Sequence, residues 1–239
     1  NKMEIKASQV KELRDMTGVA MMECKKALVE CSGDIEKALD LLRSNSALKA
    51  EKKAARVAAD GVLRVFVGDE YSTLIEINSE TDFAAKDENF IKFADDVQNY
   101  ISENKLNDVE DLNESDIEDK RKTLVQTIGE NIQLRRLESV EYSSEMHASS
   151  YLHSDSKLGA VVVVSGGDES LAKDIAMHVA AFNPLCLSES DIDPQILERE
   201  KAIYMVQAEE SGKPQEIMEK MIEGKLKRFL SEVSLLSQN

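Results

Sequence analysis

Side chains able to act as nucleophile and base are few in this sequence. It holds only three histidines, His147, His153 and His178. It contains no GxSxG, HExxH, P-loop or GxGxxG pattern. Nothing therefore indicates a triad, a metal site or a nucleotide loop of a known type. His178 falls on an amphipathic helical pattern, where a structural role is favoured. We expect a protein that is not an enzyme and holds neither cofactor nor metal.

One short segment carries residue types that suit protein binding. Asp82 and Phe83 are adjacent in a loop that follows an expected strand and precedes an expected helix. An exposed aromatic side chain beside an acid can insert into a partner. Alternatively, Phe83 covers the core and Asp82 caps the helix, and periodicity alone leans toward this second interpretation.

A pair of adjacent methionines forms a second unusual feature. Met21 and Met22 lie on a helical pattern, and a helix cannot bury two neighbours on one narrow stripe. Either one of them points outward as an adaptable contact, or the apolar face of this helix is wide. The sequence leaves both interpretations open.

Composition limits the classes of partner. The 239 residues include 46 acidic and 30 basic ones, a net charge of −16, so general binding to nucleic acid or to an anionic membrane is not expected. No apolar run is long enough to span a bilayer and the start does not resemble a signal peptide, which favours a cytoplasmic protein. The three cysteines are expected to be reduced, with Cys24 and Cys31 buried rather than redox-active.

Helical patterns dominate the two ends of the chain. Three short amphipathic helices are predicted, the third over 35–43, followed by a basic, alanine-rich helical linker over 48–59. Near the other end, 194–210 and 214–231 predict an antiparallel helical hairpin. Its contact is expected between one set of apolar residues on each arm: Ile196, Ile203 and Val206 against Ile217, Met221 and Phe229. The alternation over 231–236 predicts a final strand without a following partner, which suggests that further chain belongs after it.

The middle of the chain changes to strand periodicity. Two β-rich runs, 62–67 and 72–77, predict an antiparallel hairpin, and 88–101 predicts an amphipathic helix. Residues 103–119 predict an acidic surface loop with part of a helix, whose apolar end is expected over 123–128 before Gly129 closes it. A similar order of hairpin and helix recurs later, which suggests two related α/β subdomains; its expected elements are strands over 134–142, 149–153 and 159–164 and a helix over 171–181.

Two motifs resemble the signatures of a known family. The runs Leu13–Leu28 and Thr81–Asp87 are similar to the first and second signatures of bacterial elongation factor Ts, and further blocks fit in order. The sequence departs from the family pattern at a few positions that remove no contact side chain. These are Ala84 for the usual Val, Asp87 for the common Asn, and Val19-Ala20 for the usual Ala-Gly. The further blocks are Ala58–Gly61, Ile128–Ile132, Tyr151–His153, Ser211–Pro214 and Glu223–Lys225.

The resemblance implies an α+β fold with a defined domain order. A small three-helix, UBA-like amino-terminal bundle is followed by a core of two related subdomains, with antiparallel strands and packed helices, and an antiparallel coiled-coil hairpin. The implied ranges are 1–56 for the helical domain and linker, 57–142 for the first subdomain, 143–187 with 232–239 for part of the second, and 188–231 for the coiled coil. Family members usually continue beyond this end point.

The resemblance also implies a function and its residues. The family consists of guanine nucleotide exchange factors for the GTPase elongation factor Tu, which act by conformational coupling without cofactor or metal. The resemblance implies three groups of residues that contact the partner. The first is Asp82 and Phe83, beside Thr81, and a second group supports it: Ile128, Gly129 and His153. The third group lies on a helix: Met21, Met22 and Lys25. The alternative is a non-exchanging scaffold or chaperone. The helical arm and an open sheet edge are two places through which a homodimer is expected to form.

Overall fold

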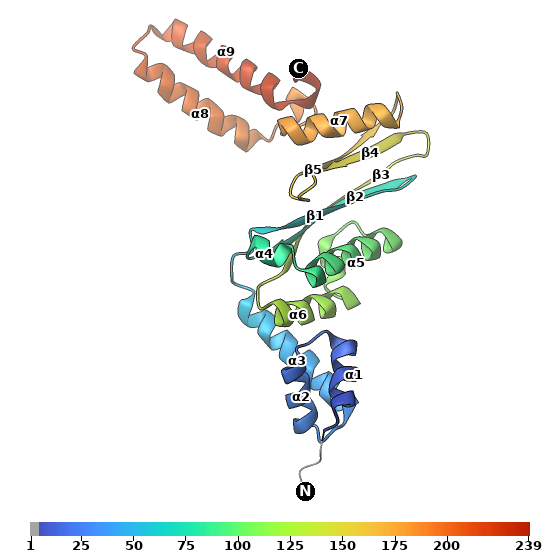
Figure 1. Ribbon diagram of the computed structural model, residues 1–239. Coiled ribbons are helices and arrows are strands. Elements are labelled where there is room, and N and C mark those ends of the chain that lie inside the picture. Colours follow the sequence, from blue (N-terminus) through green and yellow to red (C-terminus); the bar gives the residue numbers. More distant parts are fainter. Residues whose placement is uncertain (1–4) are drawn as a thin grey trace. The chain divides into compact units, whose positions relative to one another are not determined.

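The computed structural model describes residues 5–239. Its chain divides into two compact units, one ending at Ala176 and one beginning at Met177. The first contains a helical bundle and antiparallel sheets packed with helices, and the second contains a pair of long helices (Figure 1). The expected α+β fold class is therefore confirmed.

Three helices form the amino-terminal bundle: α1 (Ala7–Thr17), α2 (Met21–Glu30) and α3 (Ile35–Lys53). Their apolar faces meet around Leu13, Leu28 and Leu42, which are almost fully buried. The prediction of a helix followed by a separate helical linker was wrong, because α3 is continuous over 19 residues. No glycine or proline interrupts this stretch, and the basic residues of its last turn interact favourably with the helix dipole, which stabilises the helix end.

A three-stranded antiparallel sheet forms the centre of the first unit. It consists of β1 (Asp60–Val67), β2 (Tyr71–Ser79) and β3 (Gln133–Glu141), in the order β1-β2-β3. The expected hairpin is the β1–β2 pair. Four helices follow between β2 and β3, and the longer two cover one face of the sheet (Figure 1). These are α4 (Asp82–Ala85), α5 (Glu88–Asn104), η1 (Val109–Leu112) and α6 (Asp116–Ile128).

The core between this sheet and α5 and α6 is apolar. Phe90, Ile75 and Ile77 have no exposed surface. Helix α5 begins where the Asp87 carboxylate accepts hydrogen bonds from the backbone N–H groups of Asn89 and Phe90, as is usual for a helix cap. Gly129 ends α6 in a left-handed conformation with φ of 86°, as the sequence predicted.

Gly61 allows β1 and β2 to approach closely. A Cβ atom at this position would lie 2.1 Å from the Ile77 carbonyl oxygen and 2.7 Å from the Asn78 Cα, and its φ is +136°. We expect Gly61→Ala to lower the free energy of unfolding by about 2–3 kcal/mol, measured by urea denaturation. Gly166→Ala is the control, because no atom lies within 4 Å of its Cβ. Equal stabilities for the two variants would contradict this expectation.

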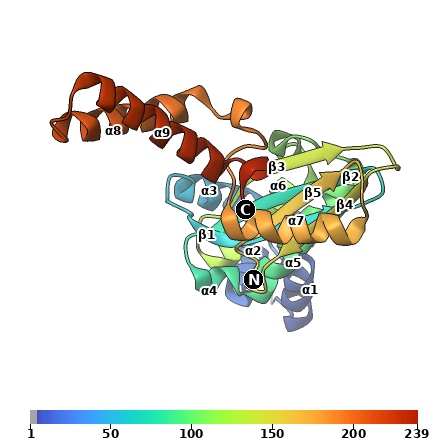
Figure 2. The same ribbon diagram turned by 90° about the horizontal axis from the view of Figure 1, so that it is seen from above.

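A second, two-stranded sheet lies on the other side of β1–β3. It pairs β4 (His147–Leu152) with β5 (Gly159–Val164) antiparallel. Figure 1 separates the two sheets into layers, and their strands overlap in the perpendicular view of Figure 2. The turn between β4 and β5 reaches β1, where the Leu63 N–H donates to the Ser156 carbonyl at 2.6 Å. Helix α7 (Glu169–Phe182) follows, so hairpin and helix occur twice in chain order.

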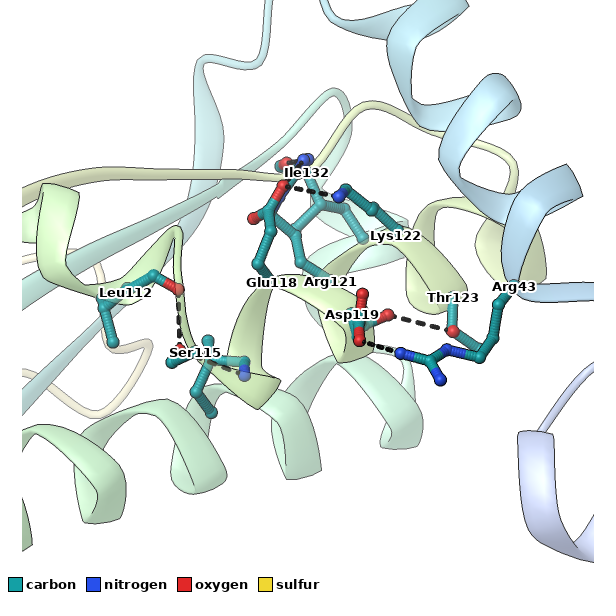
Figure 3. A network of polar contacts seen from close by, with 10 residues as sticks. Arg43, Leu112, Ser115, Glu118, Asp119, Arg121, Lys122, Thr123 and Ile132 are labelled. Carbon is teal, nitrogen blue, oxygen red and sulfur yellow. Dashed lines mark hydrogen bonds and ion pairs between the residues drawn. The ribbon is translucent and has the colours of Figure 1, made fainter. Parts of the chain in front are cut away.

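Polar contacts join the bundle to α6. Arg43 of α3 lies 2.6 Å from the Asp119 carboxylate of α6 (Figure 3). The Ser46 hydroxyl contacts the side chain of Gln126, and the Thr127 hydroxyl donates to the Gly18 carbonyl at 3.4 Å. The bundle is thereby held against the sheet's helices within the first unit.

The second unit contains the predicted helical hairpin, α8 (Pro194–Glu210) and α9 (Gln215–Val233). The two helices lie side by side in both views (Figures 1 and 2). The predicted contact residues were partly wrong, because Ile203, Val206 and Ile217 are 44%, 55% and 46% exposed.

The seam between α8 and α9 is more polar than expected. Ala208 is buried. Lys225 of α9 reaches across to α8, where its Nζ lies 2.6 Å from the Gln207 Oε1 and 5.6 Å from the centre of the Tyr204 ring. Two helices that meet along one line bury only a narrow stripe. This stripe runs through Tyr204 and Ala208, which leaves Ile203 and Val206 outside it.

The strand predicted over 231–236 was also wrong. Helix α9 continues to Val233 and a 3₁₀ turn, η3 (Leu235–Ser237), follows. Only Ser234 forms a bridge, parallel to Cys186, and the Ser234 hydroxyl donates back to the Leu230 carbonyl at 2.6 Å. Local bonds of this kind compete with strand pairing. A further 3₁₀ turn, η2 (Glu189–Asp191), precedes α8.

Candidate functional site

Phe83 projects from the short helix α4 directly after β2. The Thr81 side chain caps this helix by accepting a hydrogen bond from the Ala84 N–H. Ala84 and Ala85 are 5% and 3% exposed, whereas Phe83 is 82% exposed. Because the two alanines occupy the buried side of the turn, the phenylalanine points to solvent. The interpretation in which Phe83 covers the core and Asp82 caps the helix was therefore wrong.

Asp82 lies at the start of α4 and is held by a neighbouring lysine. The Lys86 Nζ donates to its Oδ2 at 2.9 Å. This hydrogen bond is the main cause that lowers the pKa of the Asp82 carboxyl from its ordinary value. The residue is therefore a carboxylate at neutral pH, positioned next to an exposed aromatic ring.

The turn after β4 lies beside this segment. A cavity of about 550 Å³ is lined by Asp82 and Lys86 on one side and by Ser154–Lys157 on the other. His153, at the start of this turn, is exposed, and its Nδ1 lies 3.1 Å from the Asp155 Oδ1. A salt bridge of 2.6 Å between Lys157 and Asp60 fixes the turn against β1.

The end of α6 is the third part of the site. Ile128 packs against the apolar core and Gly129 is exposed. The next residue, Glu130, is hydrogen-bonded to Thr81. The structure thus brings Thr81, Asp82 and Phe83 together with Ile128 and Gly129, and places the turn that begins at His153 across the cavity.

Met21, Met22 and Lys25 lie apart from this group, on α2 of the bundle. Met21 is 45% exposed and Met22 is 64% exposed, while the neighbouring Cys24 is fully buried. Both methionines therefore reach solvent, so the interpretation in which a wide apolar face buries the pair was wrong. Within residues 5–239, no hydrogen bond or ion pair links this group to the Thr81–Phe83 segment.

The exposed side chains of these two groups are of the types that proteins use to bind other proteins. An exposed phenylalanine beside a carboxylate and two exposed methionines offer apolar anchors with an acidic rim. In residues 5–239 no group of three or more histidine, cysteine or acidic side chains could hold a metal ion. None of the helices in this described range is long and apolar enough to cross a membrane.

An α+β fold that presents exposed apolar side chains is compatible with a factor that acts by contact with another protein. Comparison with known proteins identifies the family to which the chain belongs. A family model described as elongation factor TS matches residues 80–239. Proteins named elongation factor Ts from Hahella chejuensis, Marinobacter nauticus and Francisella tularensis subsp. novicida are 51%, 50% and 48% identical to this chain. Each alignment covers 98% of this chain, and 82%, 81% and 82% of the respective relative.

The chain belongs to the elongation factor Ts family. Its members are the nucleotide exchange factors for the translational GTPase elongation factor Tu, so the chain is an exchange factor rather than an enzyme. The partner class that follows is elongation factor Tu. The resemblance noted from the two sequence motifs is confirmed.

Sequence reasoning missed the polar residues that hold the site. Glu80 and Glu130 bind the backbone on either side of it, and Lys157 fixes the turn after His153. Glu130 stands within a block that matches the family, but its partners are 49 and 50 residues away. No local sequence pattern predicts a pairing between residues so far apart in the chain.

Proposed function

We propose that this chain binds elongation factor Tu with GDP, disturbs its magnesium and phosphate site, and so promotes GDP release. A GTPase holds its nucleotide through P-loop amides, a lysine and a magnesium ion. A factor that binds more tightly when this site is distorted weakens the nucleotide by the same coupling free energy. Exchange is then a shift in population between two states of the partner.

Phe83 is the observation that carries this proposal. The Phe83 ring is 82% exposed to water in the free chain, so its burial in a partner would remove apolar surface from water and supply binding free energy. We assign Asp82 and Phe83 to insertion between two helices of the GTPase domain, which moves the element that orders magnesium. Thr81, Ile128, Gly129 and His153 support this contact.

The helical bundle supplies a second contact in this proposal. Met21, Met22 and Lys25 hold another helix of the partner, where the flexible methionine side chains adapt to its surface. The domain ranges are part of the proposal: 1–56 and 57–142 carry these contacts, 143–187 with 232–239 carries His153, and 188–231 forms the coiled coil. Since the partner works in translation, we place this activity in the cytoplasm.

The direct test is the release rate of a fluorescent GDP from purified elongation factor Tu, with and without this chain. We expect strong acceleration that saturates as the concentration of the chain rises. Demonstrated binding without acceleration would instead favour a non-exchanging scaffold or chaperone. The maximum rate measures coupling, and the half-saturating concentration measures binding.

The contribution of the methionines is tested by the double substitution Met21→Ala, Met22→Ala. Because both side chains are exposed, we expect folding to be unaffected and the half-saturating concentration to rise about tenfold, the size of one lost anchor. Met205→Ala is the control, because Met205 on α8 is 45% exposed, as is Met21. An unchanged half-saturating concentration would remove the bundle from the proposed contact.

A homodimer is a separate part of the proposal. The exposed residues Ile203, Val206 and Ile217 of the helical pair are apolar, which supports self-association through this arm. Sedimentation at several concentrations tests it, and a constant monomer mass would rule this contact out.

A further inference from the structure

Two carboxylates join the loop before α4 to the turn after α6. The Glu130 Oε2 accepts hydrogen bonds from the backbone N–H groups of Glu80 and Thr81, each at 3.0 Å, and its Oε1 accepts from the Thr81 hydroxyl at 2.7 Å. In return, the Glu80 Oε1 accepts from the Asn131 N–H at 2.7 Å. Each glutamate thus binds the backbone beside the other, and we name this pair the glutamate clamp.

The clamp acts on the first turn of α4. Two successive N–H groups that converge on a carboxylate form a cradle for negative charge, and hydrogen bonds to an ionised acceptor are among the stronger ones. The Thr81 hydroxyl donates to Glu130 and at the same time accepts from the Ala84 N–H at 3.3 Å. Glu130 therefore orients the cap of the helix that carries Phe83.

The other end of the clamp is anchored in a buried region. Asn131 is 1% exposed, and its Nδ2 donates to the Arg56 carbonyl at 2.8 Å. Lys53, in the last turn of α3, donates to the Gly129 carbonyl. The turn that holds Glu130 is thus fixed to the chain segment after the helical bundle.

We propose that Glu130, with Glu80 as its counterpart, is a positioning residue for nucleotide exchange that holds the Thr81–Phe83 segment in its binding conformation before the partner arrives. A helix of four residues is not stable alone. Without the clamp, binding must also order this segment, which weakens the contact of Phe83. This inference rests on the proposed exchange function.

The test uses Glu130→Ala and Glu130→Gln in the full chain. Glu138→Ala is the control, because Glu138 is an exposed acid on β3 whose side chain makes no hydrogen bond or ion pair within residues 5–239. We expect Glu130→Ala to reduce the maximum rate of GDP release about five- to tenfold, a typical coupling effect. Glu130→Gln is expected to be intermediate, because its amide oxygen still accepts. Glu138→Ala, which removes the same charge, should match the original chain.

Amide hydrogen exchange in the free chain gives a second readout. In Glu130→Ala, amide hydrogen exchange should rise about tenfold or more at Glu80, Thr81 and Ala84, whose N–H groups are bonded within the clamp and the cap, while the amides of Ile75 and Ile77 in β2 stay protected. Faster exchange everywhere would mean that Glu130 stabilises the fold as a whole, and would overturn the positioning role. If Glu130→Ala does not fold, Glu130→Gln, which keeps the side-chain volume, decides by the same two readouts.

A double substitution separates this inference from the proposed function. If Glu130 acts through Phe83, Glu130→Ala should have little further effect in the Phe83→Ala background. Full exchange activity of Glu130→Ala together with a defective Phe83→Ala would overturn the clamp and leave the proposed function standing. If the original chain itself does not accelerate GDP release, the proposed function fails. Amide hydrogen exchange at Glu80, Thr81 and Ala84 in the free chain still tests the clamp in that case.

Discussion

Phe83→Ala is expected to remove most of the acceleration of GDP release. The ring is 82% exposed in the free chain, so its loss should not harm folding, and the whole effect falls on the complex. An anchor that fills a partner pocket contributes about 1–3 kcal/mol of coupling, which is about 5- to 150-fold in rate. The measurement is the maximum release rate of fluorescent GDP from elongation factor Tu at saturating factor.

Two further variants serve as a control and as a comparison for Phe83→Ala. Phe182→Ala removes a phenylalanine that is 60% exposed on α7 and should leave the rate unchanged. Asp82→Ala should have a milder effect than Phe83→Ala, since an acid at the rim of a contact mainly orients it. Unchanged nucleotide release by Phe83→Ala would refute its assignment as the inserted residue.

Phe90→Ala should have the largest effect on stability. The side chain lies at the start of α5, has no exposed surface, and packs in the core beneath the three-stranded sheet. Truncation of a buried phenylalanine leaves a cavity and costs about 3–5 kcal/mol. For a unit of this size we expect the midpoint of thermal unfolding to fall by about 10 °C or more.

Calorimetry measures this change in the first unit. Asn89→Ala, at the preceding exposed position of the same helix turn, is the control and should shift the midpoint only slightly. A loss below about 1 kcal/mol for Phe90→Ala would mean that the core closes around the missing ring, in contrast to the packing described.

Local patterns in the sequence were sufficient for most helices and strands. Helix α5 was predicted over 88–101 and extends over Glu88–Asn104, and α6 ends at Gly129 as expected. Caps, glycines and apolar periodicity act between residues that are at most a few positions apart. The prediction failed where a local signal was overridden or absent, as at the strand expected over 231–236, where α9 and a 3₁₀ turn occur instead.

The contact between α8 and α9 shows what periodicity leaves open. The two helices were predicted correctly, but the apolar residues Ile203 and Val206 lie outside the seam. Which stripe of a helix is buried depends on how the partner helix is rotated against it. With apolar side chains on more than one face, the sequence pattern permits several rotations.

The sequence by itself determined the order of most elements, the α+β class and the two motifs that relate the chain to its family. The tertiary structure alone decided that Phe83 is exposed, because this depends on Ala84 and Ala85 filling the buried side of α4. The tertiary structure alone also showed that the glutamate clamp forms, because Glu130 and Thr81, which are hydrogen-bonded, lie 49 residues apart in the chain. Such pairings form only when the sheet and its helices close, so no local pattern could specify them.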